Sequence, residues 1–446
     1  MKYFGTDGIR AIAGQHPLVK DFVEKLGFVS AQIIPKEEHN ENKTIIIAQD
    51  SRVSGSQITD WLCTGIRGAG YSVINIGIAP TPAVAFLTKK LKHPFGVMVS
   101  ASHNPAEFNG IKFFDQEGKK LSESIEAKIE TAVDSQEDLP EILDNTIKTD
   151  DDTLISLYST HLKDSINNIT FDKTKLVLDC ANGATSTIAP QLFEELGFDI
   201  DTICCQPNGK NINQDCGATA PGETFRLVKK TEETIGVTFD GDGDRVIMCD
   251  ENGEEIDGDD IILISALYLK EKGFLKENKV VGTVMSNLGL INYLKSCGIT
   301  CEITQVGDKY VFEKLQEQNL AIGGENSGHI IFKKFSDTGD GILSALQILK
   351  ILKEKNQKLS YYKKLWKRYS QKLVGIDVEE KIPLENIDGF LQKQKEFEAS
   401  LNGKGRIFTR YSGTEPKLRI LVECEDANKA EQIAKSLQKF YKEKVS

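Results

Sequence analysis

The sequence of 446 residues lacks long apolar runs. Its longest apolar stretch, Ile261–Leu269, is interrupted by Ser265 and is far shorter than the roughly 20 residues that a membrane-spanning helix needs. The N-terminal segment MKYFGTDGIR has no apolar core of the kind found in a secretory signal. We therefore expect neither a membrane span nor a signal peptide.

Regularly spaced cysteines and clustered histidines are also lacking. The nine cysteines form no C-x-x-C pair and no repeating frame, and the six histidines are scattered along the chain. The pattern indicates neither a disulfide framework nor a zinc site. We expect reduced, mostly buried thiols and a location in the reducing cytoplasm.

Basic residues are in deficit, with 55 Lys and Arg against 66 Asp and Glu and a formal net charge of −11. This balance disfavours a nucleic-acid-binding protein, which usually carries a basic face. Hydrophobic residues make up 39% and charged residues 27% of the chain, a composition that favours a folded protein over a disordered one. The length, about three times that of a typical domain, predicts several cores.

One pattern recurs three times: a β-rich run, a polar loop, an apolar-periodic helix, a glycine and a second β-rich run. This order is typical of a βαβ unit, and the glycine fits the left-handed end of a helix. The copies begin at Thr44, Lys175 and Lys279, and their glycines are Gly70, Gly197 and Gly298. We expect three α/β domains with parallel or mixed sheets rather than one large sheet.

The C-terminal part follows a different pattern. RIFTR and KLRILVEC indicate two strands around YSGTEP, and Asp426–Lys444 indicates an amphipathic helix with Asp426 at its N-cap. The lysine-rich segment Lys353–Lys367 is also expected to be helical. Acidic segments at 134–152 and 250–260 suggest boundaries. The predicted fold is three related α/β mixed-sheet domains plus a smaller α+β domain, over residues 1–150, 151–253, 254–368 and 369–446.

The densest chemical signal is FDGDGDR, which follows the strand-like TIGVTF. Asp240, Asp242 and Asp244 alternate, and in an extended segment alternate side chains face the same way. Three crowded carboxylates require a cation, and oxygen ligands suit Mg²⁺ or Ca²⁺. Gly241 and Gly243 would let the loop bend so that the carboxylates converge.

Two alternatives remain for this segment. An EF-hand would match at several positions, but Arg245 stands where the loop needs glycine, and a strand precedes it where a helix belongs. A purely structural Asp-rich turn is the second alternative.

A candidate nucleophile lies in VMVSASHNPAEFNGIKFF. The strand-like VMVS runs into a loop of small and polar residues, and NGIKFF returns as a second strand. The Ser102 hydroxyl could carry a covalent phosphoryl group, and His103 and Lys112 could shuttle protons or stabilise charge. Alone, these residues could equally serve turn hydrogen bonds.

Three further polar loops accompany these segments. GGENSGH alternates Glu325, Ser327 and His329, which could bind sugar hydroxyl groups or phosphate. RYSGTEPKLR combines two arginines with a Ser-Gly-Thr turn, as a phosphate cradle would. FGTDGIR carries Arg10 and has no evident use by itself. Each could also be an ordinary turn.

Together, FGTDGIR, SASHNP with NGIKFF, DGDGDR, GENSGH and RYSGTEP resemble the α-D-phosphohexomutase superfamily in type and order. The resemblance covers the chain from end to end, including the four-domain layout. FGTDGIR, IAPTPAVAFL, VGDKYV and GGENSGHI are most similar to its amino-sugar branch. The resemblance implies that the protein interconverts glucosamine 6-phosphate and glucosamine 1-phosphate, which feeds UDP-N-acetylglucosamine synthesis.

The resemblance also implies a role for each loop. Ser102 would be the phosphoserine and would hold one Mg²⁺ per subunit together with Asp240, Asp242 and Asp244. A hexosamine 1,6-bisphosphate would be primer and intermediate. Further catalytic residues would be Lys112, His103 and Arg10; sugar-binding residues would be Arg245, Glu325, Ser327 and His329; phosphate-binding residues would be Arg410, Ser412, Gly413, Thr414 and Arg419.

The expected partner is a small sugar phosphate, with no nucleic acid and no membrane, and a homodimer is common among similar proteins. The chain departs from the usual pattern at Ala11, Lys309 and Asn326, where Gly, Arg and Gln are common. None of these positions touches the Ser–Asp core. The alternatives are the phosphomannomutase/phosphoglucomutase branch or, from another class, a non-catalytic sugar-phosphate or calcium sensor.

Overall fold

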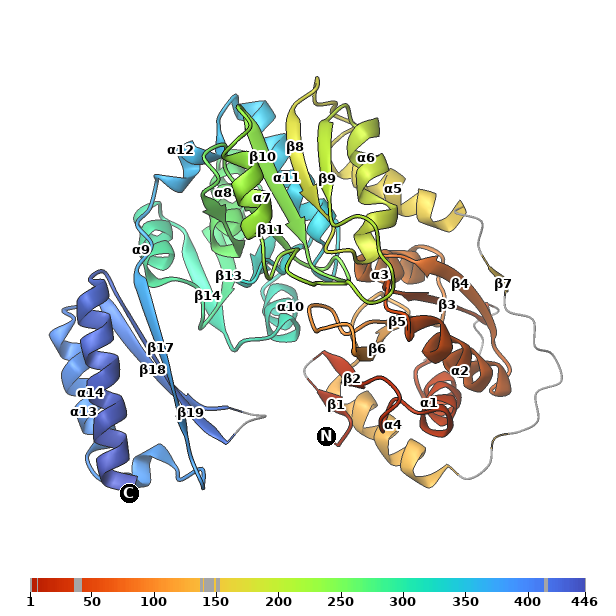
Figure 1. Cartoon of the computed structure of the whole chain (residues 1–446), viewed down its shortest axis with the longest axis horizontal. Coiled ribbons are helices and arrows are strands. Elements are labelled where there is room, and N and C mark those ends of the chain that lie inside the picture. Colours follow the sequence, from red (N-terminus) through yellow and green to blue (C-terminus); the bar gives the residue numbers. More distant parts are fainter. Residues whose placement is uncertain are drawn as a thin grey trace. The chain divides into compact units, whose positions relative to one another are not determined.

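The computed structural model describes residues 2–5, 7–35, 42–136, 139, 148–149, 153–412 and 416–445. The chain divides into two compact units (Figure 1). The first comprises Met1–Met285 and Glu302–Lys363, and the second comprises Ser286–Cys301 and Lys364–Ser446. Every described part of the Ser102, aspartate and Glu325 segments lies in the first unit.

The first sheet has seven strands in the order β1-β2-β6-β5-β3-β4-β7. It is mixed, because β3 pairs in parallel with β4 and β5 whereas β6 is antiparallel to β5 and β2. The strands are β1 (Phe4–Gly5), β2 (Gly8–Ile12), β3 (Thr44–Gln49), β4 (Ser72–Ile78), β5 (Phe95–Val99), β6 (Phe108–Asp115) and β7 (Lys148–Thr149). The accompanying helices are α1 (Lys20–Ile33), α2 (Gly55–Gly68), α3 (Thr81–Lys90) and α4 (Glu123–Ser135).

The apolar run of β3 is continuous because both faces of its sheet are covered. Ile45 and Ile47 belong to a core formed with residues of α1, α2 and α4. Ile46 lies beside Gly96 of β5, and a side chain at Gly96 would collide with Thr88 of α3. The helices packed on both faces of the sheet hold the carboxyl ends of β3 and β5 in place. The Ser102 loop follows β5 directly.

The second sheet has five strands in the order β12-β11-β10-β8-β9. β8 is parallel to β9 and β10, and β10 is antiparallel to β11. The strands are β8 (Lys175–Asp179), β9 (Asp199–Ile203), β10 (Thr234–Phe239), β11 (Val246–Cys249) and β12 (Glu255–Ile256). The helices of this region are α5 (Thr153–Ser165), α6 (Ala189–Glu195) and α7 (Gly222–Val228), with a 3₁₀ turn at Ala184–Thr187.

The third sheet has the order β14-β13-β15-β16, with β13 parallel to β15 and β15 antiparallel to β16. The strands are β13 (Lys279–Thr283), β14 (Thr300–Thr304), β15 (Ile322–Gly324) and β16 (Ile330–Phe332). The helices are α8 (Gly258–Glu271), α9 (Leu288–Ser296), α10 (Asp308–Glu317), α11 (Gly341–Lys355) and α12 (Leu359–Lys363), with a 3₁₀ turn at Lys276–Asn278. Of these, α9 belongs to the second unit.

The second unit is built on an antiparallel sheet in the order β17-β19-β18. Its elements are β17 (Ser370–Asp377), β18 (Gly405–Tyr411), β19 (Lys417–Cys424), α13 (Phe390–Ser400) and α14 (Ala427–Val445), with a 3₁₀ turn at Leu384–Asn386. The Asp426 carboxylate accepts hydrogen bonds from the amides of Asn428 and Lys429, so it caps α14 as predicted. The predicted apolar face, Ala430, Ile433, Ala434 and Leu437, is buried in this core.

The three predicted βαβ units are confirmed as strand, helix and neighbouring strand in three separate sheets. Gly70, Gly197 and Gly298 have positive φ angles of 86°, 88° and 66°. A side chain is disfavoured in that conformation, which explains glycine after each helix.

Two expectations need comment. The single helix predicted at Lys353–Lys367 is wrong, because α11 ends at Lys355, where Asn356 takes the left-handed conformation and reverses the chain. The predicted boundary between residues 150 and 151 lies outside the described residues. None of the helices in the described ranges is long and apolar enough to cross a membrane.

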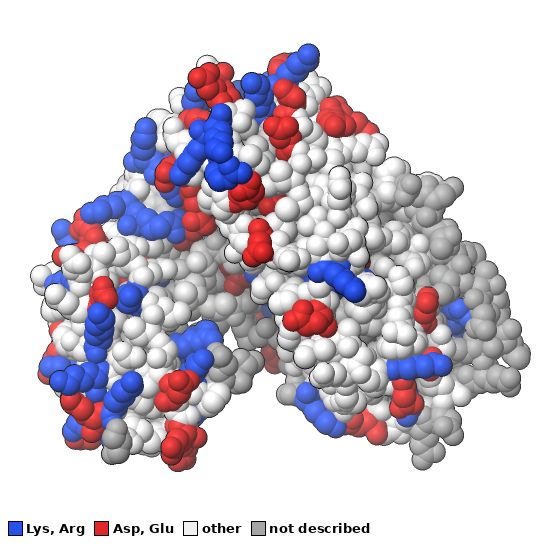
Figure 2. All heavy atoms as spheres, viewed as in Figure 1, with Lys and Arg blue, Asp and Glu red and all other residues white. Residues whose placement is uncertain are grey.

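The nine cysteines are all free thiols, five of them buried and four partly exposed. Acidic and basic side chains are interspersed over the face drawn in Figure 2. That face therefore shows no single patch of one charge.

Candidate active site

The Ser102 loop connects the antiparallel strands β5 and β6. Ser102 has a positive φ of 52° and is only 1% exposed. Its amide donates to Ser100 Oγ at 2.9 Å, and its carbonyl accepts from Arg52 and from Asn213 Nδ2, both at 2.9 Å. These bonds hold a backbone conformation that residues with a side chain rarely adopt. Strained conformations of this kind cluster at functional sites.

The Ser102 hydroxyl faces the aspartate loop, defined as Asp240–Arg245. Ser102 Oγ donates to Asp240 Oδ2 at 2.7 Å, and His103 Nδ1 lies 3.2 Å from the same hydroxyl. The nucleophile predicted from one segment and an acid predicted from another are therefore in direct contact.

The aspartate loop is a tight turn between β10 and β11, not the extended segment expected from the alternation. Gly243 has a φ of 73°, and a Cβ at Gly241 would lie 2.5 Å from the Ser102 carbonyl oxygen. The turn, rather than the two-residue period, makes the carboxylates converge. The flanking strands also exclude the EF-hand alternative, which needs two helices.

The residues of this loop fit a hard cation. Asp240, Asp242 and Asp244 are buried, and one oxygen of each lies within 4.8 Å of the others. Asp242 Oδ1 and Asp244 Oδ1 are buried and have no hydrogen-bond partner among the described residues. Buried carboxylate oxygens are costly without a partner, and an all-oxygen donor set is the one that Mg²⁺ prefers.

Asp240 and Asp242 differ in their electrostatics. Burial, reinforced by Asp244 and Asp242, raises the pKa of Asp240 well above its usual range. Burial also acts to raise the pKa of Asp242, but the Lys112 ammonium and hydrogen bonds from Lys112 and Thr81 outweigh it and lower that pKa. Lys112 and Arg245 thus partly neutralise the charge of the loop.

Lys112 and His103 have opposite protonation states. Lys112 Nζ, 2% exposed at its side chain, lies 2.8 Å from Asp242, 3.0 Å from Asp7 and 3.4 Å from Asp244. Burial acts to lower its pKa, but these carboxylates raise it well above the usual value. Burial and the nearby Arg245 and Arg10 lower the pKa of His103 to about 4. At neutral pH the lysine is charged and the histidine is a neutral base.

The two predicted arginines lie beside these groups. Arg10 pairs with Asp7, and one of its terminal nitrogens is 3.4 Å from Asn104 Oδ1. The Arg245 amide donates to Asp240 Oδ1 at 3.1 Å, and its guanidinium is 3.9 Å from Asp244. Arg245 also forms an isolated β-bridge with His329, which brings the Glu325 loop to the aspartate loop.

The Glu325 loop (Glu325–His329) is the tight turn of the β15–β16 hairpin, so its alternation does not reflect an extended strand. Glu325 Oε1 accepts from the Gly307 amide at 2.9 Å. His329 Nε2 accepts from the Gly339 amide at 3.2 Å. Ser327 Oγ and His329 Nδ1 are buried without hydrogen-bond partners among the described residues, so both keep an unused hydrogen-bonding capacity.

A cavity of about 300 Å³ lies beside Lys112, the lysine that contacts Asp242 of the aspartate loop. Its lining also includes Asp7, Lys120, Gly307, Lys309 and Tyr310. This volume is at the lower end of the roughly 300–1,000 Å³ found for small-molecule sites.

Several residues of the site were missed by the sequence analysis. Asp50 and Arg52 form a fully buried ion pair at 2.9 Å, and Arg52 also donates to the carbonyls of Ser102 and Asn104. Their signal was available, because the polar DSR follows β3 at the carboxyl edge of a parallel pair, where ligand sites gather. Thr81 Oγ1 donates to Asp242 at 2.6 Å, and no sequence pattern indicates this contact.

In the second unit, Arg410 of β18 is the direct partner of Arg419 in β19. Side chains of paired residues share a face, and two like charges there favour a bound anion. Ser412 is buried, and its amide donates to the Lys417 carbonyl at 2.8 Å. The predicted phosphate ligands Gly413 and Thr414 lie outside the described residues.

Comparisons with known proteins show the family of the chain. Family models of phosphoglucomutase/phosphomannomutase match in chain order: alpha/beta/alpha domain I at residues 1–139, domain II at 156–253, domain III at 257–369 and the C-terminal domain at 373–439. The phosphoglucosamine mutase of Caldicellulosiruptor saccharolyticus is 42% identical over 450 residues and covers 100% of both chains.

Solved structures share the fold. A phosphoglucomutase/phosphomannomutase family protein from Burkholderia thailandensis has a TM-score of 0.80 at 21% identity, over 98% of this chain and 97% of that one. Aspergillus fumigatus N-acetylphosphoglucosamine mutase, solved with GlcNAc-6P and magnesium, has a TM-score of 0.69 at 19% identity, over 100% and 96%. With the full-length relative, these findings establish that the chain belongs to the phosphoglucosamine mutases, a family of isomerases in the α-D-phosphohexomutase superfamily.

Proposed function

We propose that this protein interconverts glucosamine 6-phosphate and glucosamine 1-phosphate, with Ser102 as the phosphoryl carrier. The observation that supports this most directly is the 2.7 Å contact between Ser102 Oγ and Asp240, inside a buried group of three carboxylates. A hydroxyl oriented by strained backbone toward a cation-binding loop is suited to phosphoryl transfer. A non-catalytic sensor has no need of such a group.

The reaction consists of two transfers of opposite direction. In the first, the bond between Ser102 Oγ and phosphorus breaks while the sugar 1-hydroxyl bonds to phosphorus, which yields the 1,6-bisphosphate. The sugar 1-hydroxyl loses its proton to a base of the site, and Ser102 Oγ takes up a proton as its bond to phosphorus breaks. In the second transfer, the bond between the sugar 6-oxygen and phosphorus breaks while Ser102 Oγ bonds to phosphorus. The Ser102 hydroxyl gives up its proton, the 6-oxygen takes one up, and glucosamine 1-phosphate leaves. A hexosamine 1,6-bisphosphate can therefore also prime an unphosphorylated enzyme.

Asp240, Asp242, Asp244 and the phosphorylated Ser102 would hold one Mg²⁺. When bound, this cation would neutralise the charge of the phosphoryl group during its transfer. The uncompensated oxygens of Asp242 and Asp244 support this assignment.

We assign the remaining residues of the site either to proton transfer and charge stabilisation or to substrate binding. His103 is neutral and 3.2 Å from Ser102 Oγ, so we assign it as the base; Lys112 remains charged, so we assign it to charge stabilisation and proton donation. Arg10 and Arg245 would bind phosphate oxygens beside them. Glu325, Ser327 and His329 would hold the sugar, and Arg410, Ser412, Gly413, Thr414 and Arg419 the phosphate that is not being transferred.

This activity would supply glucosamine 1-phosphate for UDP-N-acetylglucosamine synthesis. We further propose a cytoplasmic location, because nine free thiols suit a reducing compartment. A homodimer is the expected assembly, with no nucleic-acid or membrane partner.

The test is a comparison of rates with Mg²⁺ and a hexose 1,6-bisphosphate primer. Glucosamine 6-phosphate is compared with glucose and mannose phosphates, using wild type, Ser102→Ala and Ser124→Ala, an exposed serine that serves as the matched control. We expect a preference for the amino sugar that Ser102→Ala abolishes and Ser124→Ala keeps. A preference for glucose or mannose phosphate would move the protein to the neighbouring branch.

Intact mass before and after phosphatase treatment gives a second measurement. We expect primed wild type to carry one phosphoryl group that the phosphatase removes and that Ser102→Ala never acquires. Absence of Ser102-dependent turnover with every sugar phosphate would overturn the proposal.

A further inference from the structure

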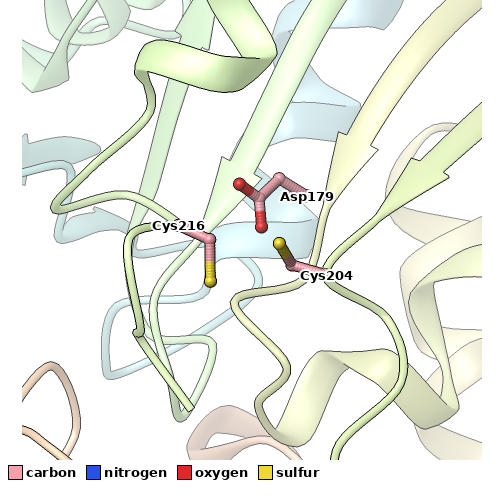
Figure 3. A group of neighbouring side chains, drawn as sticks. All are labelled: Asp179, Cys204 and Cys216. Carbon is pink, nitrogen blue, oxygen red and sulfur yellow. The ribbon is translucent and has the colours of Figure 1, made fainter. Parts of the chain in front are cut away.

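A second group of metal-ligand side chains lies at the edge of the second sheet. Asp179 ends β8, Cys204 follows the end of β9, and Cys216 lies in the connection to α7 (Figure 3). One ligand atom of each lies within 4.8 Å of the others. Because β8 and β9 are parallel neighbours, their carboxyl ends bring Asp179 and Cys204 together.

The backbone conformation at Cys204 directs its side chain toward Asp179. Cys204 has a φ of 49°, which is uncommon for a residue with a side chain. Its carbonyl accepts the Asn182 amide, which holds that conformation. In Figure 3 the Cys204 sulfur points toward the Asp179 carboxylate. Asp179 and Cys216 are buried and Cys204 is partly exposed, so a solvated ion has a route of entry.

We propose that Asp179, Cys204 and Cys216 bind a thiophilic divalent cation of the Zn²⁺ type, with a fourth position open to water or a small ligand. Two thiolates, one carboxylate and an open position are a donor set that Zn²⁺ accepts. The site is chemically distinct from the aspartate loop, whose three ligands are all oxygen. The cysteine and histidine pattern of the sequence by itself does not indicate this site.

The spacing of the cluster is compatible with a bound cation. Zinc–sulfur bonds of about 2.3 Å in a tetrahedral site place neighbouring ligand atoms roughly 3.8 Å apart. The three ligand atoms of this cluster lie within 4.8 Å of one another, a range that includes this spacing.

Surrounding groups already orient two of the ligands. Asp179 Oδ1 accepts the Ala181 amide at 2.8 Å, and Oδ2 accepts the Gly217 amide at 2.8 Å and the Thr224 hydroxyl at 3.4 Å. Each carboxylate oxygen has two lone pairs, so Oδ1 keeps one for a cation. Asn182 Nδ2 approaches Cys216 Sγ at 3.9 Å. Hydrogen bonds that orient the side chains coordinating a metal ion are a usual feature of metal sites.

The experiment uses full-length protein, reduced and freed of metal, titrated with Co²⁺ as a spectroscopic probe for Zn²⁺. Coordination by thiolates gives a sulfur-to-cobalt charge-transfer band in the near ultraviolet, which an all-oxygen site cannot produce. We expect one equivalent of Co²⁺ to develop this band in wild type and Zn²⁺ to remove it. The readout is independent of catalytic activity, so failure of the proposed mutase function would not affect it.

Cys204→Ser and Cys216→Ser should each weaken the binding of Co²⁺ at least about 10-fold. Loss of a group that only orients a ligand already lowers metal affinity by about that factor, and loss of the ligand itself should cost more. The matched control is Cys205→Ser, since Cys205 is equally exposed, is adjacent in sequence and donates instead to the Ile203 carbonyl. It should bind like wild type. Absence of the band in wild type, or its persistence in both ligand variants, would overturn the proposal.

Discussion

Asp242 uses its two oxygens differently. Oδ2 accepts from Lys112 at 2.8 Å and from Thr81 at 2.6 Å, whereas Oδ1 has no hydrogen-bond partner among the described residues. One oxygen therefore anchors the loop, and the other is available for a cation. A residue with both roles can be probed by a substitution that keeps its shape but removes its charge.

Asp242→Asn should lower kcat at least about 100-fold, because a ligand charge is lost while the side-chain volume is kept. The far-ultraviolet circular dichroism spectrum should be unchanged. Asp201→Asn, an exposed position on β9, is the control and should retain activity. Unchanged turnover in Asp242→Asn would contradict the assigned cation site.

At the scale of the element, two loops meet backbone to backbone. Gly241 of the aspartate loop lies so close to the Ser102 carbonyl that a Cβ would be 2.5 Å from its oxygen and 2.8 Å from Asn213 Nδ2. The distance between nucleophile and acid therefore depends on the absence of one side chain. Real Cβ atoms do not approach backbone oxygen this closely, so one loop must move.

Gly241→Ala should destabilise the protein by about 1–3 kcal/mol through overpacking and lower kcat at least about 10-fold. Gly222→Ala is the matched control, because an added Cβ there meets nothing within 4 Å. Thermal unfolding and steady-state kinetics measure both effects. If Gly241→Ala kept wild-type kcat, the close approach would not position Ser102.

The N-terminus of α11 contains a titrating cap. Asp340 accepts the Leu343 amide at 2.9 Å and the Tyr158 hydroxyl at 2.8 Å. Burial nevertheless raises the pKa of Asp340 to about 7. Since the folded protein binds this proton more tightly than the unfolded chain, the contribution of Asp340 to stability falls as the pH rises from about 4 to 7.

Asp340→Asn removes this titration and keeps a capping oxygen. The free energy of unfolding of the variant, relative to wild type, should therefore rise between pH 5 and pH 8, by on the order of 2 kcal/mol. Denaturant unfolding of metal-free protein at both pH values measures it. A difference that does not change with pH would mean that Asp340 titrates normally.

At the scale of the whole molecule, the proposed chemistry is divided between the two units. The first contains the Ser102, aspartate and Glu325 loops, and the second contains the Arg410–Arg419 pair. A mutase must hold its substrate in two orientations, so the phosphate that is not transferred needs ligands of its own. We expect those ligands to affect substrate affinity more than the transfer step.

Arg419→Ala should raise KM about 10- to 100-fold, the equivalent of about 1.5–3 kcal/mol for a charge-assisted hydrogen bond, with a smaller change in kcat. Lys435→Ala, an exposed lysine of α14 paired with Glu431, is the control. An effect of Arg419→Ala confined to stability, with unchanged KM, would show that the arginine is structural.

Sequence patterns were most reliable where local physics decides. The glycines after three helices and the Asp426 cap follow from backbone conformation and nearby hydrogen bonds, and all were confirmed. The extended backbone predicted from the alternation of Asp240, Asp242 and Asp244 is wrong, because a tight turn also brings next-but-one residues together. The end of α11 at Lys355, with Asn356 as its left-handed C-cap, was not predicted, because the spacing of apolar residues does not show where a helix ends.

The sequence by itself determined the kinds of residue in each loop, their order and the resemblance that they carry. Only the tertiary structure decided which loops meet. The Ser102–Asp240 contact joins residues 138 positions apart. The Asp50–Arg52 ion pair and the Asp179–Cys204–Cys216 cluster likewise depend on which strands lie side by side. Such contacts depend on sheet order and on the packing of helices against both faces, and no short segment encodes either.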